Sequence, residues 1–178
     1  MSIDDLVKEM LPPKEPSEVP NNLNNQLWDT IESKLGLVIP NDYKEFIQIY
    51  GSGSIDSFLT IFNPFSENIN INLIDQLYVQ SEVYKDLKSY GEEVPYDFFP
   101  LKNGILPFGM TDNGDVLFWQ VNDLPKEWNV IINEARSSNW DVLKISMTDF
   151  LLGILQRKVV CNFFPSTFPS KEPSFEQF

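Results

Sequence analysis

The stretch that decides the fold runs from Leu27 to Phe46 and has the sequence LWDTIESKLGLVIPNDYKEF. Apolar residues recur at every fourth position through its first half, at Leu23, Leu27, Ile31 and Leu35. That spacing predicts an amphipathic helix, which Gly36 ends in a left-handed conformation. A second helix is predicted after Pro40, with four apolar side chains on one face: Tyr43, Phe46, Ile47 and Tyr50.

The remainder of the chain predicts mostly strands. A strand over 57–62 and a helix over 73–87 precede strands at 105–109, 115–121, 130–133 and 140–146. The segment 68–72 suits a strand or a helix-entry loop equally, and a last helix begins at Ser146. Because helices and strands segregate along the chain, the predicted fold class is α+β, an antiparallel sheet of about four to six strands with helices packed around it.

The segment Asp112-Asn113-Gly114 predicts a β-hairpin, because Asn-Gly tolerates the positive φ angles of a type I′ turn. In the strand that follows, Val116 and Phe118 alternate with Leu117 and Trp119, so both faces are apolar. The hairpin is therefore either covered on both faces or exposes one face to a partner. Core packing is favoured for the tryptophans of this region, and Trp128, in a predicted loop, is the hardest to assign to the core.

Proline-rich segments flank the predicted domain. Residues 1–20 are expected to form a short helix over 3–10 and an extended linker, and residues 21–158 the folded domain. Residues 159–178 alternate prolines with phenylalanines, too many of them for an unpacked tail. They are expected to form a strap that packs on the sheet or on another subunit.

Composition excludes several function classes. The 178 residues include no histidine, so a Ser-His-Asp or Cys-His nucleophile and a histidine-ligated metal are excluded. With 13 basic and 26 acidic residues, the net charge is −13. That charge disfavours nucleic acid and anionic membranes as ligands and favours a basic partner. Cys161, beside apolar residues, is expected to be a buried, reduced thiol.

The sequence offers little else that points to chemistry. Asp112, Asp115 and Asp123 flank one hairpin, but their spacing does not fit a calcium loop, and no metal or cofactor is predicted. The first residues are acidic where a signal peptide is positively charged, so no signal peptide is expected. Apolar runs such as FLLGIL are far shorter than a membrane span, so no span is expected either. The expected location is cytoplasmic.

Three motifs, in order, resemble the SUKH superfamily of SMI1/KNR4-like domains. The first is the Leu27–Phe46 stretch followed by the glycine break at 51–53. The second is Leu106-Pro107-Phe108-Gly109 with the turn and strand after it, and the third is the entry to the closing helix, from Ser146 to Leu151. The resemblance implies an α+β domain with a protein-binding cleft and no known catalytic activity. Members include immunity partners of bacterial toxins, commonly nucleases, and proteins similar to fungal cell-wall synthesis regulators.

On this basis the leading hypothesis is an immunity protein, not an enzyme, that neutralises a basic toxin domain by masking its active surface. The partner-binding residues expected from the motifs are Trp28, Glu32, Asp42, Tyr43, Asp112, Asp115 and Trp119. Structural roles remain an alternative for Trp28, Tyr43 and Asp112. A second hypothesis is an intracellular regulatory or scaffold module, and a third is a hydrolase that works with carboxylates alone.

Overall fold

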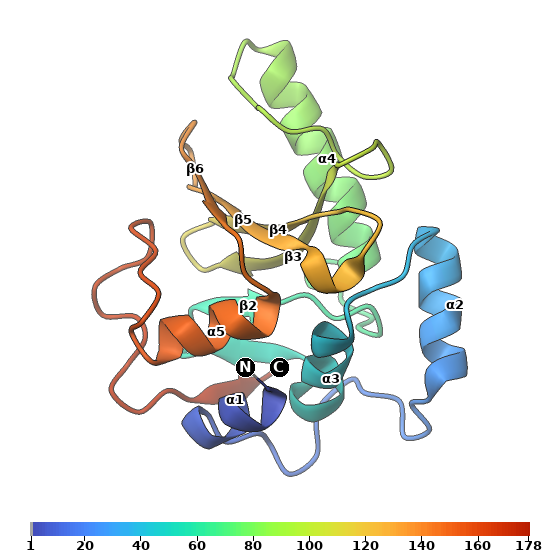
Figure 1. The fold of residues 1–178 in the computed structure, drawn as a ribbon, viewed down its shortest axis with the longest axis vertical. Helices are drawn as coiled ribbons and strands as arrows, with labels where there is room; N and C mark the ends of the chain where they lie inside the picture. Colours follow the sequence, from blue (N-terminus) through green and yellow to red (C-terminus); the bar gives the residue numbers. More distant parts are fainter. Residues whose placement is uncertain (1) are drawn as a thin grey trace.

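The computed structural model describes residues 2–178 and contains one antiparallel sheet with the strand order β6-β5-β4-β3-β2-β1-β7 (Figure 1). The helices are α1 (Ile3–Glu9), α2 (Asn25–Leu35), α3 (Asn41–Tyr50), α4 (Leu73–Ser89) and α5 (Met147–Leu155), with the short 3-10 helix η1 (Pro125–Glu127). The strands are β1 (Gly53–Ile55), β2 (Leu59–Ile61), β3 (Ile105–Thr111), β4 (Val116–Gln120), β5 (Asn129–Asn133), β6 (Trp140–Leu143) and β7 (Phe175–Gln177). The predicted α+β class is confirmed, with one strand more than the expected maximum.

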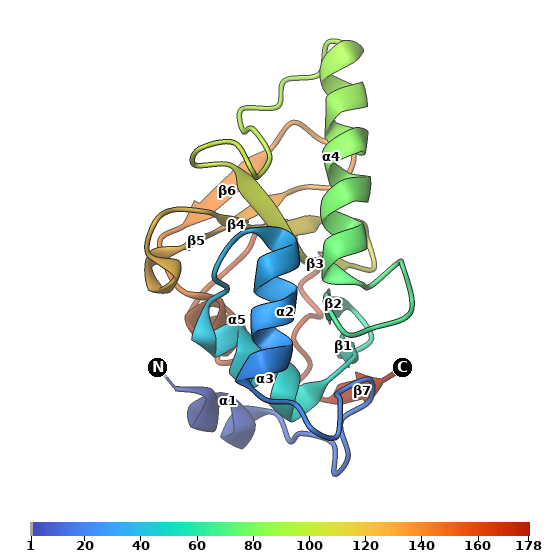
Figure 2. The ribbon, with the colours of Figure 1, turned by 90° about the vertical axis from the view of Figure 1, so that its right-hand side faces the viewer.

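Helices cover both faces of the sheet. On one face α1, α3 and α5 pack together over the larger hydrophobic core, and on the other α4 lies against β3 (Figures 1 and 2). Alternate side chains of β4 enter the two cores: Leu117 and Trp119 lie in the larger one, and Val116 and Phe118 in the one beside α4. The β3–β4 hairpin is therefore covered on both faces and exposes neither to a partner.

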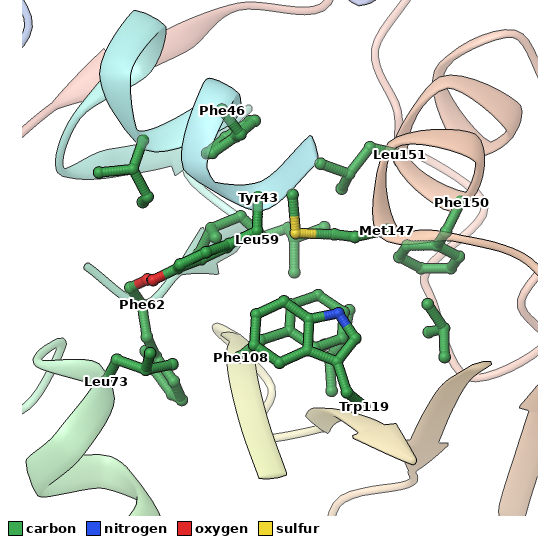
Figure 3. Close-up of a cluster of buried hydrophobic side chains, with 14 of the residues drawn as sticks. Tyr43, Phe46, Leu59, Phe62, Leu73, Phe108, Trp119, Met147, Phe150 and Leu151 are labelled. Carbon is green, nitrogen blue, oxygen red and sulfur yellow. The ribbon is translucent and has the colours of Figure 1, made fainter. Parts of the chain in front are cut away.

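Trp119 lies at the centre of the larger core. Its ring stacks on Phe108, with the ring centroids 4.6 Å apart, while Tyr43 and Met147 approach it from the helix layer (Figure 3). Trp128 is buried as well, although it belongs to a loop. Its indole nitrogen donates a hydrogen bond of 2.9 Å to the carbonyl of Asn122. That bond removes the cost of burying an unpaired donor.

The β3–β4 turn differs from the expected type I′. That turn needs positive φ at two residues, and here Gly114 has φ 93° whereas Asn113 does not lie in the left-handed region. The amide of Gly114 donates to the carbonyl of Thr111, as in a type I turn followed by a left-handed glycine. The hairpin itself is confirmed, because a glycine after a type I turn also reverses the chain.

The strand predicted over 57–62 is observed as the short strand β2, and a second short strand, β1, precedes it without a sequence signal of its own. The segment 68–72 is a loop, not a strand. Its last residue, Asn72, caps α4 by accepting hydrogen bonds from the amides of Ile74 and Asp75. The side chain of Asn68 likewise accepts a hydrogen bond from the amide of Asn70. Asparagine side chains thus accept from backbone amides in this segment, as carbonyls of a neighbouring strand would in a sheet.

The N-terminal segment packs on the domain, more closely than a free linker would. Leu6 and Met10 are fully buried, and the hydroxyl of Tyr50 donates a hydrogen bond of 2.7 Å to the carbonyl of Met10. Ser17 contacts the backbone of Gly51 and Ser52 at the end of α3. The predicted boundary at residue 21 stays a prediction, but Leu6 and Met10 belong to the same core as the domain.

The C-terminal strap packs on the sheet of its own chain. Its end forms β7, which pairs antiparallel with β1 at the sheet edge. The ring of Phe175 lies 5.1 Å from that of Tyr50, and the carboxylate of Asp56 accepts hydrogen bonds from the amides of Ser170 and Ser174. Of the two alternatives open for the strap, packing on the sheet is the one observed.

We predict that Phe175→Ala destabilises the protein by about 1–3 kcal/mol, less than a fully buried phenylalanine because this ring is half-buried. The matched control is Phe178→Ala, whose side chain is exposed and should change the free energy of unfolding by less than about 0.5 kcal/mol. Urea unfolding followed by tryptophan fluorescence measures both. Equal effects of the two substitutions would show that the strap adds no stability through Phe175.

Candidate functional site

The three aromatic residues predicted to contact a partner form a buried series of rings. The ring of Tyr43 packs edge-on against Trp119, with centroids 5.0 Å apart, and against Trp28 at 6.2 Å. All three side chains are buried. They connect α2, α3 and β4 and present almost no surface.

Glu32 holds the loop between α2 and α3. Its carboxylate accepts a hydrogen bond of 2.8 Å from the amide of Ile39 and forms a 2.6 Å ion pair with Lys44 on α3. The ammonium group of Lys44 also lies 5.8 Å from the centroid of the Trp28 ring, in cation–π geometry. The loop 36–40 is thereby folded back against the helix that precedes it.

Asp42 connects the beginnings of two helices. One carboxylate oxygen accepts from the amide of Tyr43 in α3 (2.9 Å), and the other accepts from the amide of Thr148 in α5 (3.0 Å). First-turn amides have no partner within their own helix, and the dipole there favours a negative charge. A single carboxylate thus satisfies donors of helices that lie more than a hundred positions apart in sequence.

The two hairpin aspartates differ from each other. Asp115 is buried, and its carboxylate accepts from the hydroxyl of Thr111 (2.7 Å) and the amide of Ala135 (2.9 Å), which connects the hairpin to the β5–β6 turn. Asp112 is exposed at the hairpin tip. Across residues 2–178, no group of three or more acidic or cysteine side chains is placed to hold a metal ion.

A cleft lies beside these residues, between the α2–α3 loop and η1. Its volume is about 440 Å³. Asp42 and Trp119 of the predicted set reach it, whereas Glu32 holds the loop that forms one side. The opposite side consists of Leu124, Pro125 and Lys126.

A second hollow, of about 400 Å³, adjoins the first and shares Val38 and Pro125 with it. Leu101 and Lys102 stand on its far side. We call the two hollows together the double cleft. Its rim carries three exposed aliphatic side chains from three separate loops: Val38 is 58% exposed, Leu101 59% and Leu124 49%.

The lining of the double cleft is mostly apolar. Its charged residues are few and of both signs, with Lys102 and Lys126 against Asp42 and Asp123. Sequence reasoning missed the three rim residues, although each is an aliphatic residue within a loop. Of the seven residues that it selected, Glu32 holds the Val38 loop, and Asp42 and Trp119 line the first hollow. A partner contact by any of the seven selected residues stays a prediction.

The excess negative charge is spread over the surface. Eighteen of the 26 acidic residues are exposed, and they include Asp4 in α1 and Asp86 in α4, two helices at opposite ends of the molecule (Figure 1). The thiol of Cys161 is buried, and burial raises its pKa to about 11. Its thiolate is therefore scarce at neutral pH, as expected for a structural cysteine.

We predict that Glu32→Ala lowers the free energy of unfolding by about 1.5–3 kcal/mol, because it removes a charged acceptor from the Ile39 amide and leaves Lys44 without its partner. Glu82→Ala is the matched control. It removes an exposed pair with Lys85 and should cost less than about 1 kcal/mol. Chemical denaturation of both variants tests this, and a loss for Glu32→Ala no larger than the control's would contradict the structural role.

Comparisons with known proteins agree with the geometry. The model of the SMI1-KNR4 cell-wall family matches residues 25–151, a range that includes all three sequence motifs, the α2–α3 loop and η1. No curated protein and no solved structure matches the chain. Since the family match covers most of the sequence and the fold is α+β with an antiparallel sheet, this chain belongs to the SUKH (SMI1-KNR4 cell-wall) family.

Proposed function

We propose that this chain is a non-enzymatic protein-binding domain that binds a basic partner at the double cleft. The proposed partner is a toxin domain, of which a nuclease fits best, and the bound chain masks its active surface. The observation that carries the proposal is the rim of the cleft. Three exposed aliphatic side chains, Val38, Leu101 and Leu124, surround two adjoining hollows. Such anchors beside a depression are typical of binding hot spots.

The loops that carry these anchors are held by internal hydrogen bonds. Glu32 holds the Val38 loop through the amide of Ile39. The side chain of Asn122 donates to the carbonyl of Glu127 and accepts from the amide of Leu124, while Trp128 donates to its backbone carbonyl. Because these loops are ordered before a partner arrives, less conformational entropy is lost on binding.

The net charge of −13 supports a basic partner. Exposed carboxylates on elements at both ends of the molecule attract a cationic protein from more than one direction, which raises the association rate without fixing the docked orientation. Orientation then comes from the apolar rim. A nuclease, whose own surface must attract phosphates, has the complementary charge, and the cytoplasm is where its immunity partner would be needed.

The cell-wall description of the matched family favours a second candidate, a regulatory or scaffold module of the same fold. Its partners would be endogenous proteins of signalling or envelope synthesis. The two candidates differ in salt dependence. Steered association with a basic toxin should slow at least tenfold between 50 and 500 mM salt, on the order expected for screened surface charges, whereas a regulatory complex should change much less.

We predict that co-expression rescues growth from a toxin encoded by the neighbouring gene and that the two proteins form an isolable complex. Val38→Asp should weaken the complex at least tenfold, because it places a charge where an apolar contact is expected. The matched control is Val160→Asp. It makes the same change at an exposed valine of the strap, outside both hollows, and should leave affinity unchanged.

Three outcomes would contradict the proposal. One is the absence of any complex with a basic neighbour product; another is equal weakening by the two aspartate substitutions. The third is turnover of glycoside or phosphoester substrates that Asp112→Asn or Asp115→Asn abolishes. Such turnover would favour the hydrolase hypothesis, although the exposed Asp112 and the hydrogen-bonded Asp115 do not form an acid–base pair in this structure.

A further inference from the structure

The second half of α4 extends beyond the sheet. The helix buries Leu73, Gln76, Gln80 and Tyr84, but every residue from 85 to 93 is exposed. In both views the far end of the helix rises past the strands (Figures 1 and 2). Helical stability in proteins comes mainly from a packed apolar face. A projecting helix end therefore gains stability when another protein segment packs on it.

An apolar stripe continues along this exposed part. Val79, Val83, Leu87 and Tyr90 follow one another at spacings of four, four and three, so they share one side of the helix, and all four are exposed. Tyr90, at the end of the stripe, is 85% exposed. Of the large apolar residues left exposed in the described chain, no other helix carries so many in line.

Acidic residues border the stripe on its outer side. At about 100° per residue, Asp75, Glu82 and Asp86 form a row next to it, whereas Lys85 and Lys88 fall on the opposite half of the helix. Lys85 reaches back to Glu82 of that row at 3.4 Å, and Lys88 pairs with Asp97 at 3.2 Å. The apolar stripe therefore faces a predominantly negative surrounding.

Val83 and Leu87 also line a groove of about 440 Å³, separate from the double cleft. Its opposite side is the β5–β6 turn, and Glu92 and Glu93 stand at one end. Arg136 is the one basic residue among the residues that line it. We call this feature the α4 groove.

The opposite side of the α4 groove is held in place. The hydroxyl of Tyr84 donates a 2.6 Å hydrogen bond to Asn133, whose amide group donates to the carbonyl of Asn139 (2.9 Å). Asp115 holds the same turn through the amide of Ala135. The groove is thus preformed between a helix and a fixed turn, which lowers the entropy lost when a ligand enters.

We propose that the α4 groove is a second docking site, and that it binds a basic amphipathic helix of a partner protein. The stripe from Val79 to Tyr90 covers twelve residues and rises about 16 Å, which matches the apolar face of a three-turn helix. Lysines or arginines flanking that face would meet Glu82, Asp86 and Glu92. The acidic border argues against a second copy of this chain and against an anionic lipid surface, since like charges would face each other.

The test uses a synthetic 18-residue helix of leucine and lysine, with leucines at every third or fourth position, and a scrambled peptide of equal composition. Fluorescence anisotropy with the full chain should show that the amphipathic peptide binds at least tenfold more tightly than the scrambled one. Glu82→Lys/Asp86→Lys should weaken its binding at least tenfold. Asp4→Lys/Glu9→Lys, the same charge change on α1, is the matched control and should have a small effect.

Equal binding of the scrambled peptide, or an equal loss with the α1 variant, would show that charge alone attracts the peptide and would overturn the proposal. A dimer in sedimentation that Val83→Asp dissociates would also overturn it, in favour of a second copy as the occupant. Val38→Asp in the double cleft should leave peptide binding unchanged. The α4 proposal can therefore fail while the proposed function stands, and the reverse.

Discussion

The buried phenol of Tyr43 joins the parts of this protein that would otherwise be separate layers. Its ring contacts Trp28 of α2. It also contacts Trp119 of β4, and its hydroxyl donates a 2.6 Å hydrogen bond to the carbonyl of Phe62, just beyond β2 (Figure 3). Burial raises the pKa of this phenol well above its ordinary value, so it remains a donor at any physiological pH. The position of the α2–α3 loop, and with it the double cleft, depends on this contact.

Three carboxylates complete that arrangement from the inside. Glu32, Asp42 and Asp115 each accept a hydrogen bond from a backbone amide outside their own helix or hairpin, and each holds a loop or a helix end. Part of the acidity of the chain is therefore structural. The exposed carboxylates that remain shape the field around the molecule, while aliphatic side chains on the held loops provide the contact surfaces.

Long periodic segments were predictable, and short ones were not. The helices of the Leu27–Phe46 stretch, the length of α4 and the alternate faces of β4 all follow from spacing, because each spans enough residues to show a period. The strands β1 and β7 have three residues each, too few for any pattern, and form because distant segments meet at the sheet edge. The candidate site followed the same division. The motifs marked Glu32, which holds the Val38 loop, and not the exposed residues Val38, Leu101 and Leu124.

Composition and local spacing alone establish an acidic, histidine-free α+β domain with a helical hairpin and a β-hairpin, because these properties depend on near neighbours in the chain. Tertiary structure decided which aromatic rings are buried, where the strap ends, and that loops 37–40, 99–103 and 122–126 surround one depression. It also left the outer stripe of α4 uncovered. The physical reason is that burial depends on what packs over a residue, and its covering segments come from distant parts of the sequence.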